Sequence, residues 1–265
     1  MNPIGVVICN YNKKDFVLQC VQSVFESKEK NFDIYVVDNA SSDGSAEALK
    51  KAYGNRITVI ENKENLGGSG GFNTGLRIVR DKGYSYFMCL DDDAAVDENA
   101  LSVLYHYMEE HTDTGMAGCR VYHTQMSDYI QQSGLLIDFD NCTAKTIGAD
   151  MPEDGSLPDV IECDTVATCA VMVRADTVKQ KGVGIMPEDN FIYWDDMEWG
   201  YRIKLAGYRV VTLAEAKALH QMGANTKKEN TFINYYMWRN RTNFFMRFTP
   251  EAQMEAMSVK VLGAV

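Results

Sequence analysis

Three consecutive carboxylates, Asp91-Asp92-Asp93, directly follow an apolar stretch at residues 84–90. Adjacent carboxylates repel one another, and a divalent cation such as Mn²⁺ or Mg²⁺ relieves this repulsion because it prefers oxygen ligands. Side chains alternate in direction along an extended segment, so Asp91 and Asp93 can face one way while Asp92 faces another. The run predicts a metal site, and the alternative is a polar turn that caps a helix starting near Asp97.

Asp195, Asp196 and Glu198 form a second acidic cluster, inside the aromatic segment at residues 191–202. Carboxylates in apolar surroundings are partly desolvated, which raises their pKa and makes them better bases toward an alcohol. The same residues can instead supply acidic charge to the first turn of a helix expected at residues 195–206. Both roles stay open for different members, and we predict that at least one of the three is catalytic.

His220 is the only histidine in the second half of the chain. We expect it after a strand at residues 208–213, on the same rim as the aspartate run. Imidazole is an acceptable ligand for Mn²⁺ and a less natural one for Mg²⁺. A structural role is the alternative, because a lone histidine is more often structural than a ligand.

A glycine-rich segment at residues 65–75 leads into a helix. Glycines there let backbone N–H groups approach an anion at the helix N-terminus. The segment does not match the usual nucleotide fingerprints, because Asn73 stands where G-x-G-x-x-G needs its third glycine and the chain has no G-x-x-x-x-G-K-[ST]. A tight turn is the alternative.

Polar residues also follow the first two expected strands. They are Asn10 and Asn12 after residues 4–9, and Asp38 and Asn39 after residues 34–37. A carboxylate at a strand end can accept hydrogen bonds from a ribose hydroxyl or a base N–H. The Ser-Ser-Asp-Gly run at residues 41–44 is instead typical of a helix cap.

The elements that must hold these residues alternate along the first half. Apolar β-branched runs predict strands and helical spacing predicts helices between them, at residues 4–9, 13–27, 34–37, 44–53, 57–60, 70–82 and 84–90. This order predicts a doubly wound, mostly parallel α/β sheet, whose ligands bind beyond the carboxyl ends of the strands.

The second half has a different character. We expect strands at residues 116–122, 166–173 and 208–213, and an acidic loop at residues 138–163. A final aromatic and basic segment, residues 231–248, either packs on the domain or docks on an anionic membrane surface.

The composition limits the partners. The chain has 265 residues and a formal net charge of −11, so a nucleic acid is not expected to bind. Seven cysteines without a C-x-x-C pair predict buried free thiols in a reducing compartment. No apolar run approaches the ~18 residues of a membrane span. We therefore expect a cytoplasmic protein, at most attached to the inner face of the plasma membrane.

Five motifs in register resemble those of the family 2 glycosyltransferases of GT-A fold, over about residues 4–248. They are Asn10-Tyr11-Asn12, residues 37–44, residues 65–68, Asp91-Asp92-Asp93 and Trp194-Asp195-Asp196-x-Glu198. Residues 65–75 and the Trp-Asp-Asp segment look most like galactofuranosyltransferases and bacterial rhamnosyltransferases. The resemblance implies a Rossmann-like GT-A domain over residues 1–230 and a helical extension packed on it over residues 231–265.

The resemblance also implies an activity. It is inverting transfer of a sugar from a nucleotide-diphosphate donor to a hydroxyl of a glycan or lipid-linked acceptor, in cell-surface polysaccharide synthesis. UDP-galactofuranose, another UDP-hexose and dTDP-rhamnose are all candidate donors. A nucleotide-sugar pyrophosphorylase is the alternative enzyme, although its glycine-rich loop after the first strand is missing. A non-catalytic carbohydrate-binding protein is the third interpretation.

The family's roles carry over to individual residues. Asp91, Asp93 and His220 would hold Mn²⁺ or Mg²⁺, and Asp196 would be the catalytic base, supported by Asp195 and Glu198. Many relatives have Glu and Asp at positions 195 and 198, so the identity of the base stays open. The nucleotide-sugar-binding residues implied are Asn10, Asn12, Asp38, Asn39, Asn65, Gly67, Gly71, Asn73, Asp92 and Trp194.

Overall fold

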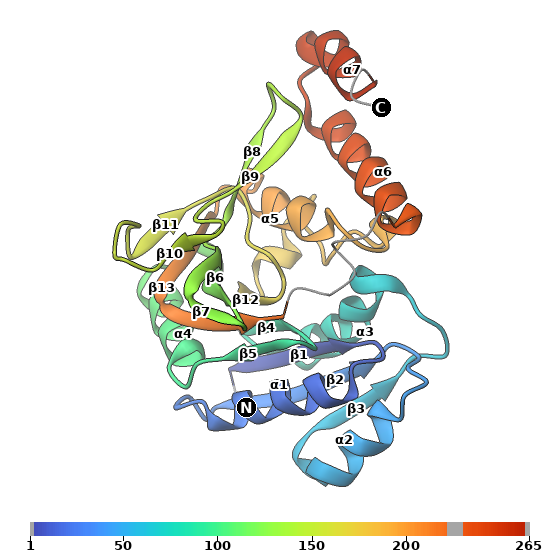
Figure 1. The fold of residues 1–265 in the computed structure, drawn as a ribbon, viewed down its shortest axis with the longest axis vertical. Helices are drawn as coiled ribbons and strands as arrows, with labels where there is room; N and C mark the ends of the chain where they lie inside the picture. The colour runs from blue at the N-terminus through green and yellow to red at the C-terminus, as the bar shows by residue number, and fades with distance from the viewer. Residues whose placement is uncertain (1–2, 222–229, 263–265) are drawn as a thin grey trace.

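The computed structural model describes residues 3–221 and 230–262. One mixed sheet of 11 strands has helices on both of its faces, and a separate two-stranded hairpin projects from it (Figure 1). The first elements are β1 (Ile4–Asn10), α1 (Lys14–Glu26), β2 (Phe32–Asp38), α2 (Ser45–Tyr53), β3 (Thr58–Glu61), α3 (Gly67–Lys82) and β4 (Tyr86–Asp91). These confirm the predicted alternation.

The first part of the sheet is parallel. Strand β1 pairs with β2 and β4, and β2 pairs with β3, all in the same direction. Helix α3 begins at Gly67, three residues earlier than predicted. Because β1, β2 and β4 run in the same direction, their carboxyl ends meet at one edge, as the doubly wound pattern requires.

The second part of the sheet is largely antiparallel. Its elements are β5 (Ala94–Val96), α4 (Ala100–Glu110), β6 (Thr114–His123), β7 (Met126–Gln132), β10 (Met151–Pro152), β11 (Val160–Glu162), β12 (Ala170–Arg174), α5 (Asp195–Leu205) and β13 (Arg209–His220). Strand β12 runs antiparallel between β4 and β6, while β13 runs parallel to β6. The helix expected to start near Asp97 begins at Ala100, because residues 94–96 first pair with β13 as β5.

Two predictions for this half were wrong. The loop at residues 138–163 contains β9 (Thr143–Thr146), which pairs with β8 (Leu135–Asp138), as well as β10 and β11. The strand expected to end at residue 213 continues to His220 across an irregularity between Leu213 and Lys217. In β13, pairing with distant strands overrides weak local β-propensity, whereas β9 forms a local hairpin with the strand that precedes it.

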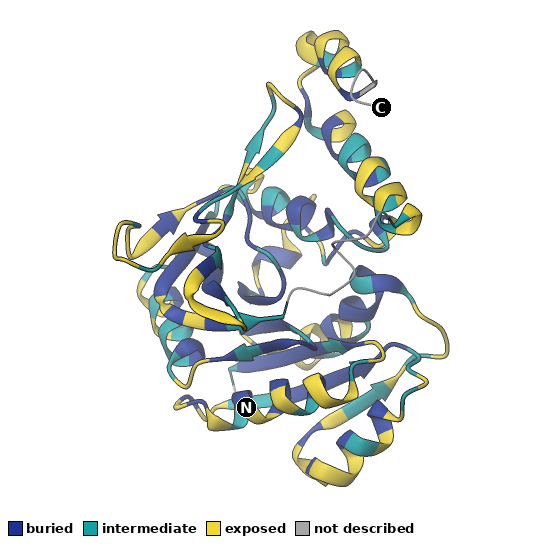
Figure 2. Ribbon diagram, viewed as in Figure 1, coloured by how far each residue is buried: buried dark blue, intermediate teal, exposed yellow. Residues whose placement is uncertain are grey.

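The core lies on both faces of the sheet (Figure 2). On one face α1, α2 and α4 cover residues such as Val6, Met88 and Val211. On the other face α3 and α5 cover residues such as Val7 and Phe87. Burying both faces explains why these strands read as continuous apolar runs.

The C-terminal helices α6 (Thr231–Phe248) and α7 (Met254–Leu262) form a third cluster with the β8–β9 hairpin (Figure 1). Phe244 and Phe245 of α6 are fully buried there, against Cys142 and Trp194. Helix α6 has the predicted bounds, and the last residues of the predicted extension, 263–265, lie outside the described part.

All seven cysteines are free, and six of them are buried. Within residues 3–221 and 230–262, no helix is both long enough and apolar enough to span a membrane.

Candidate active site

The carboxyl ends of β1, β2 and β4 bring the predicted polar residues to one edge of the sheet, which we call the rim. Asn10 at the end of β1 lies opposite Asp38 of β2, and Cys9 lies opposite Asp91 of β4. The antiparallel pair of β13 and β5 sets His220 opposite Ala94, directly beside the aspartate run. Strand pairing thus joins residues that are more than a hundred positions apart.

Asp91, Asp93 and His220 form a compact group. One ligand atom from each lies within 4.8 Å of the others. His220 Nε2 is 3.2 Å from Asp93 Oδ1 and 3.7 Å from Asp91 Oδ2. Asp92 points elsewhere, because its Oδ2 accepts a hydrogen bond from the Tyr11 N–H at 3.0 Å. This arrangement has the alternation that the sequence predicted.

Gln131 of β7 orients the His220 ring. Its side-chain Nε2 donates to the His220 carbonyl at 3.2 Å, and its Oε1 lies 2.7 Å from His220 Nδ1. Nδ1 therefore donates to Gln131, and Nε2 faces the two aspartates. An outer partner of this kind is typical of metal-binding histidines, because it fixes the tautomer and the ring direction.

Lys13 is a cation at this group that the sequence interpretation did not include. Its Nζ lies 3.0 Å from Asp92 Oδ1 and 2.6 Å from Asp93 Oδ2. The second Asp93 oxygen, Oδ1, is buried and lies 3.2 Å from His220 Nε2. Lys13 therefore leaves free the Asp93 oxygen that faces His220.

The charges in this group shift one another's pKa values. Burial works to raise the pKa of Asp93, but His220 and Lys13 outweigh it and the pKa is lowered. Burial likewise works to lower the pKa of His220, and the two facing aspartates raise it instead. Two carboxylates and an oriented imidazole are a suitable donor set for Mn²⁺, so these residues fit the predicted metal.

Asp195 and Asp196 begin α5 on the same rim. Neither carboxylate forms a salt bridge with any described residue, and Asp196 Oδ1 accepts only the Met197 N–H, at 2.8 Å. Burial raises the pKa of both groups, and their mutual repulsion raises that of Asp195 further. The Asp196 charge also contributes to raising the pKa of Asp91, so the two acidic clusters lie near enough to interact electrostatically. A partly exposed carboxylate with a raised pKa suits a proton acceptor.

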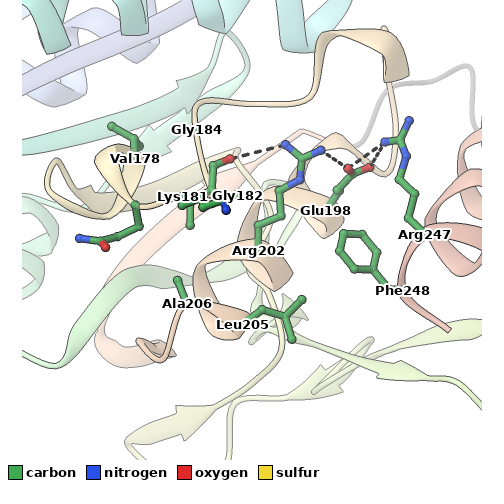
Figure 3. Close-up of a pocket in the computed structure, with 12 residues that line it drawn as sticks. Val178, Lys181, Gly182, Gly184, Glu198, Arg202, Leu205, Ala206, Arg247 and Phe248 are labelled. Carbon is green, nitrogen blue, oxygen red and sulfur yellow. Dashed lines mark hydrogen bonds and ion pairs between the residues drawn. The ribbon is translucent and has the colours of Figure 1, made fainter. Parts of the chain in front are cut away.

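Glu198 is turned away from this pair. Its buried carboxylate contacts Arg202, and both of its oxygens lie 2.8 Å from Arg247 Nη1 of α6 (Figure 3). It borders a hollow of about 740 Å³ that none of the rim's acidic residues line. A carboxylate held between two guanidinium groups is a poor proton acceptor, so the predicted catalytic support by Glu198 is not what this geometry favours.

The residues after β1 and β2 hold each other. Asn10 Nδ2 donates to Asp38 Oδ1 at 2.9 Å, while Asn10 Oδ1 is buried without a partner among the described residues. Asn12 is exposed, and its Oδ1 accepts the Ser42 N–H at 2.7 Å. Asp43 accepts the Ser45 N–H at 3.0 Å, but the N-cap residue of α2 is Gly44, so no side chain caps the helix directly. This corner therefore keeps one unused acceptor, the Asn10 oxygen.

The amides predicted to bind the donor are mostly committed to the fold. Asn39 donates to Asn65 Oδ1 and to the Gly67 carbonyl, both at 2.9 Å, and its own oxygen accepts from the Asn62 side chain and the Leu66 N–H. Asn73 is fully buried and joins α3 to Met186 and Glu188. Side chains with every polar atom in use have little left for a ligand.

The glycines of α3 serve close packing. Gly67 has a φ of +73°, and a Cβ there would lie 2.2 Å from the Phe191 carbonyl. A Cβ at Gly71 would lie 2.4 Å from Cys9 Sγ. The Gly67 N–H donates to Asn65 Oδ1 and the Ser69 N–H to the Phe191 carbonyl. The predicted anion site at this helix start is therefore largely closed by the protein's own acceptors.

Trp194 is also placed differently from the prediction. Its side chain is 6% exposed and packs against Phe244 and Phe245, with ring centroids at 5.4 and 5.7 Å. It belongs to the C-terminal cluster and not to the rim. Because α6 covers the ring, little of its surface is left for the donor that it was predicted to contact.

Four residues near the rim were outside the predicted site: Tyr11, Lys13, Gln131 and Asn240. The Tyr11 side chain is 46% exposed at the end of β1. Its position after a strand was a usable signal. Gln131 and Asn240 carried none, because their roles depend on contacts with His220 and with residues 190–193 that no spacing encodes.

Known proteins resemble this chain in sequence. The model of the glycosyl transferase family 2 matches residues 5–168. A teichoic acid poly(glycerol phosphate) polymerase of Staphylococcus epidermidis is 26% identical in a match that covers 53% of this chain and 19% of that protein. A UDP-Glc:α-D-GlcNAc-diphosphoundecaprenol β-1,3-glucosyltransferase of Escherichia coli is 29% identical over 41% of this chain and 42% of that protein. The chain thus matches less than half the length of either relative.

Solved structures share the fold. GalNAc-T7, crystallised with UDP, GalNAc and Mn²⁺, superposes with a TM-score of 0.72 at 14% identity, covering 94% of this chain and 48% of that one. A mannosyltransferase of Pyrobaculum calidifontis, in complex with GDP-Man and Mn²⁺, has a TM-score of 0.65 at 15% identity, covering 98% and 69%. The predicted GT-A type fold is confirmed. Because the family model matches more than half of its residues, this chain belongs to glycosyl transferase family 2.

Proposed function

We propose that this protein transfers a sugar from a nucleotide-diphosphate donor to a hydroxyl acceptor, with inversion at the anomeric carbon. One observation carries the proposal. A metal-type group, Asp91, Asp93 and His220, shares a rim with Asp195 and Asp196, two carboxylates of raised pKa that form no salt bridge with any described residue. The first group suits a diphosphate with its cation and the second suits a proton acceptor, which are the two tasks of this reaction.

The donor's nucleoside would lie at the ends of β1 and β2. The buried Asn10 oxygen, which lacks a partner among the described residues, supports this, since it can accept a nucleobase N–H. The exposed Tyr11 ring offers a face for stacking, and Asp38 lies beside Asn10. The other amides predicted for this role, such as Asn39 and Asn73, would act indirectly by fixing the loops.

The diphosphate would lie against Asp91, Asp93 and His220. A bound Mn²⁺ or Mg²⁺ would supply the positive charge that stabilises the departing diphosphate. Lys13 would keep Asp92 and one Asp93 oxygen turned away from that position, because it holds both carboxylates. Gln131 would keep the His220 Nε2 directed at it.

Asp196 would remove the proton of the attacking hydroxyl. Asp196 is more exposed than Asp195, so an acceptor can reach it more easily. The pKa of the buried Asp195 is raised more, so Asp195 would hold the single proton of the pair and leave Asp196 ionised. One positioned carboxylate is enough for a displacement of this kind, since the leaving group departs without needing a proton.

The sugar and the nucleotide can be identified by binding. We propose a UDP- or dTDP-linked hexose, with galactofuranose and rhamnose as the first candidates, for a cell-surface glycan or lipid-linked acceptor. Thermal unfolding would be followed with UDP-galactofuranose, UDP-glucose, UDP-GlcNAc and dTDP-rhamnose, each with and without Mn²⁺. A true donor should raise the melting temperature in proportion to its affinity, and only with the metal.

The products then decide the reaction. A glycosyltransferase releases the nucleoside diphosphate when an acceptor alcohol is added, whereas a pyrophosphorylase would form a nucleoside triphosphate from added pyrophosphate. Binding of a donor without either reaction would support a carbohydrate-binding protein. Release of the nucleoside diphosphate only with an acceptor is the result we expect.

Membrane contact is a further part of the proposal. Helix α6 exposes Tyr235, Trp238 and Met246, and it also carries Arg239 and Arg241. Aromatic and basic residues on one helix suit an anionic lipid surface, where a lipid-linked acceptor would be found. The double variant Tyr235→Ser/Trp238→Ser should sediment less with phosphatidylglycerol vesicles than the parent. Leu205→Ser, at an exposed apolar residue on α5, is the matched control, and equal sedimentation of all three proteins would refute the contact.

A further inference from the structure

The loop that leads into the Asp195-Asp196 pair has an unusual backbone. Phe191, Tyr193 and Trp194 have φ values of +64°, +65° and +64°, a region that side chains other than glycine seldom adopt. Three such residues within four positions do not persist unless their surroundings hold them. The direction in which α5 presents its first carboxylates depends on this loop, because Trp194 is the residue directly before the helix.

Asn240 of α6 holds this loop. Its side chain is fully buried, and its Nδ2 lies 2.8 Å from each of three carbonyl oxygens, those of Asn190, Ile192 and Tyr193. Its Oδ1 accepts from Arg239 Nε at 2.8 Å. This second contact fixes which end of the amide faces the loop. Both N–H bonds of the Asn240 amide therefore point at the strained segment, residues 190–194.

Arg239 extends the same contact. Its Nη2 donates to the carbonyls of Asp189 at 2.6 Å and Asn190 at 2.9 Å. On its other side the loop contacts α3, because the Ser69 N–H donates to the Phe191 carbonyl at 3.3 Å. The strained segment is thus held between α3, which packs on the sheet, and α6, which lies outside the part of the chain that the family model matches.

We propose that Asn240 is a positioning residue for the Asp195-Asp196 pair, so that helix α6 is part of the catalytic apparatus and not only an extension. The inference rests on the proposed function for its kinetic effect. Asn240 touches neither carboxylate. It acts through the three carbonyls, whose orientation sets the left-handed turns at Tyr193 and Trp194 and hence the start of α5.

The chemistry of the side chain makes the proposal specific. An aspartate at position 240 would keep the shape but would aim carboxylate oxygens at the carbonyls, which are all acceptors. An alanine would remove the contacts and leave the three carbonyls without this donor. Asn243, on the same helix, is the matched control, because its amide has no hydrogen-bond partner in the described ranges.

The experiment compares Asn240→Ala, Asn240→Asp and Asn243→Ala with the parent chain. With the best donor and Mn²⁺, we expect kcat to fall about 10²-fold in both Asn240 variants, since a small misplacement of a reacting group has effects of that size. The donor dissociation constant, measured by titration, should stay within about twofold of the parent. Asn243→Ala should match the parent in both quantities.

Hydrogen exchange provides a readout that needs no activity. The amide hydrogens of Phe191 and Ile192 are bonded to the carbonyls of Glu188 and Asn190. Their exchange should become faster in the Asn240 variants while exchange in the β1–β4 core stays as in the parent. If the parent transfers no sugar from any donor, the proposed function fails and this exchange result still tests the contact.

Three results would overturn the inference. They are a parental kcat in Asn240→Ala, an equal loss of donor affinity and of kcat, and an acceleration of exchange over the whole chain, which would indicate only a loss of stability. If Asn240→Ala does not fold, Asn240→Gln, which keeps the amide but displaces it, is judged by the same measurements.

Discussion

The two acidic clusters on the rim are similar in sequence and opposite in environment. Asp91, Asp92 and Asp93 share their space with two cationic groups, Lys13 and His220. Asp195 and Asp196 have no cationic partner in the described part of the chain, and burial raises the pKa of both. In the first cluster the pKa of Asp93 is lowered, so this carboxylate is prepared to stay ionised beside a cation, although burial raises the pKa of Asp91 and Asp92. The second cluster is prepared to accept a proton.

The difference shows that the number of carboxylates in a motif does not determine its chemistry. Glu198 makes the point within a single helical turn, because it lies three residues after Asp195 and is neutralised by Arg202 and Arg247. What each carboxylate can do depends on the charge that faces it and on its contact with water. The following predictions test this contrast between a compensated and an uncompensated cluster.

The largest effect is expected at the uncompensated cluster. Asp196→Asn removes the proposed proton acceptor, and we expect kcat to fall by about 10²- to 10⁴-fold. Donor binding with Mn²⁺ should change little, since the substitution leaves the metal-type group intact. Steady-state kinetics and a binding titration give the two numbers. A variant with near-parental kcat would remove Asp196 as the base.

Asp93→Ala should have the opposite pattern. It removes an oxygen that faces His220, so Mn²⁺ affinity should fall by at least the 10- to 100-fold that loss of an outer-shell partner causes. Isothermal titration with Mn²⁺, alone and with the nucleotide, measures this, and Asp81→Ala at an exposed site is the control. Unchanged affinity would refute the metal assignment.

Acid should affect the two clusters differently. Because burial raises the pKa of Asp196, the rate should already fall about tenfold per pH unit at pH values where an ordinary carboxyl group stays ionised. The free energy of unfolding depends on pH with a sign that differs between the two clusters. The raised pKa values of Asp195 and Asp196 contribute stability below their unfolded values that is lost as the pH rises. The lowered pKa of Asp93 contributes stability above its unfolded value that is lost on acidification.

The pH measurements are kcat/KM profiles and melting temperatures in the same buffers. A rate that stays constant down to the ordinary carboxyl range would contradict a desolvated base. As the pH is lowered, the rate should begin to decline before the melting temperature falls. This order separates titration of the base from acid unfolding.

Lys13→Met should make the compensated cluster resemble the other one. Removing this cation eliminates its repulsion of a bound metal, so Mn²⁺ should bind roughly tenfold more tightly. Without metal the variant should melt below the parent, because Asp92 and Asp93 stay buried with one cation fewer. Melting curves with and without Mn²⁺ test both statements. Equal metal-induced stabilisation of variant and parent would show that Lys13 does not compete with the cation.

The smallest effect on activity is expected from Glu198→Gln. Kcat should stay within a few-fold of the parent, while stability falls by about 2 kcal/mol because two guanidinium groups lose their carboxylate. Asp189→Asn removes an exposed partner of Arg247 and should cost less than about 1 kcal/mol. Denaturant unfolding and kinetics on the same samples distinguish the roles. A catalytic defect as large as that of Asp196→Asn would return Glu198 to the reaction.

Much of the fold could be predicted because its first half is encoded locally. Strands β1, β2 and β4 are apolar runs, and polar residues follow them where each strand ends. The second half was harder, since β13 continues through Ala214 and Lys217, which have little β-propensity, only because β5 and β6 pair with it. The second strand of the β8–β9 hairpin, Thr143–Thr146, was mistaken for a loop because it is short and has no buried residue.

The sequence by itself determined the alternating order of strands and helices, the acidic runs at strand and helix ends, and the helix at residues 231–248. Spacing and periodicity are local properties, so they can be read along the chain. The tertiary structure alone decided that Gln131 orients His220, that Lys13 compensates Asp93, that arginines neutralise Glu198 but not Asp196, and that Asn240 holds the loop before α5. Charge compensation and hydrogen bonding act between atoms a few ångströms apart in space, and no pattern along the chain reports those distances.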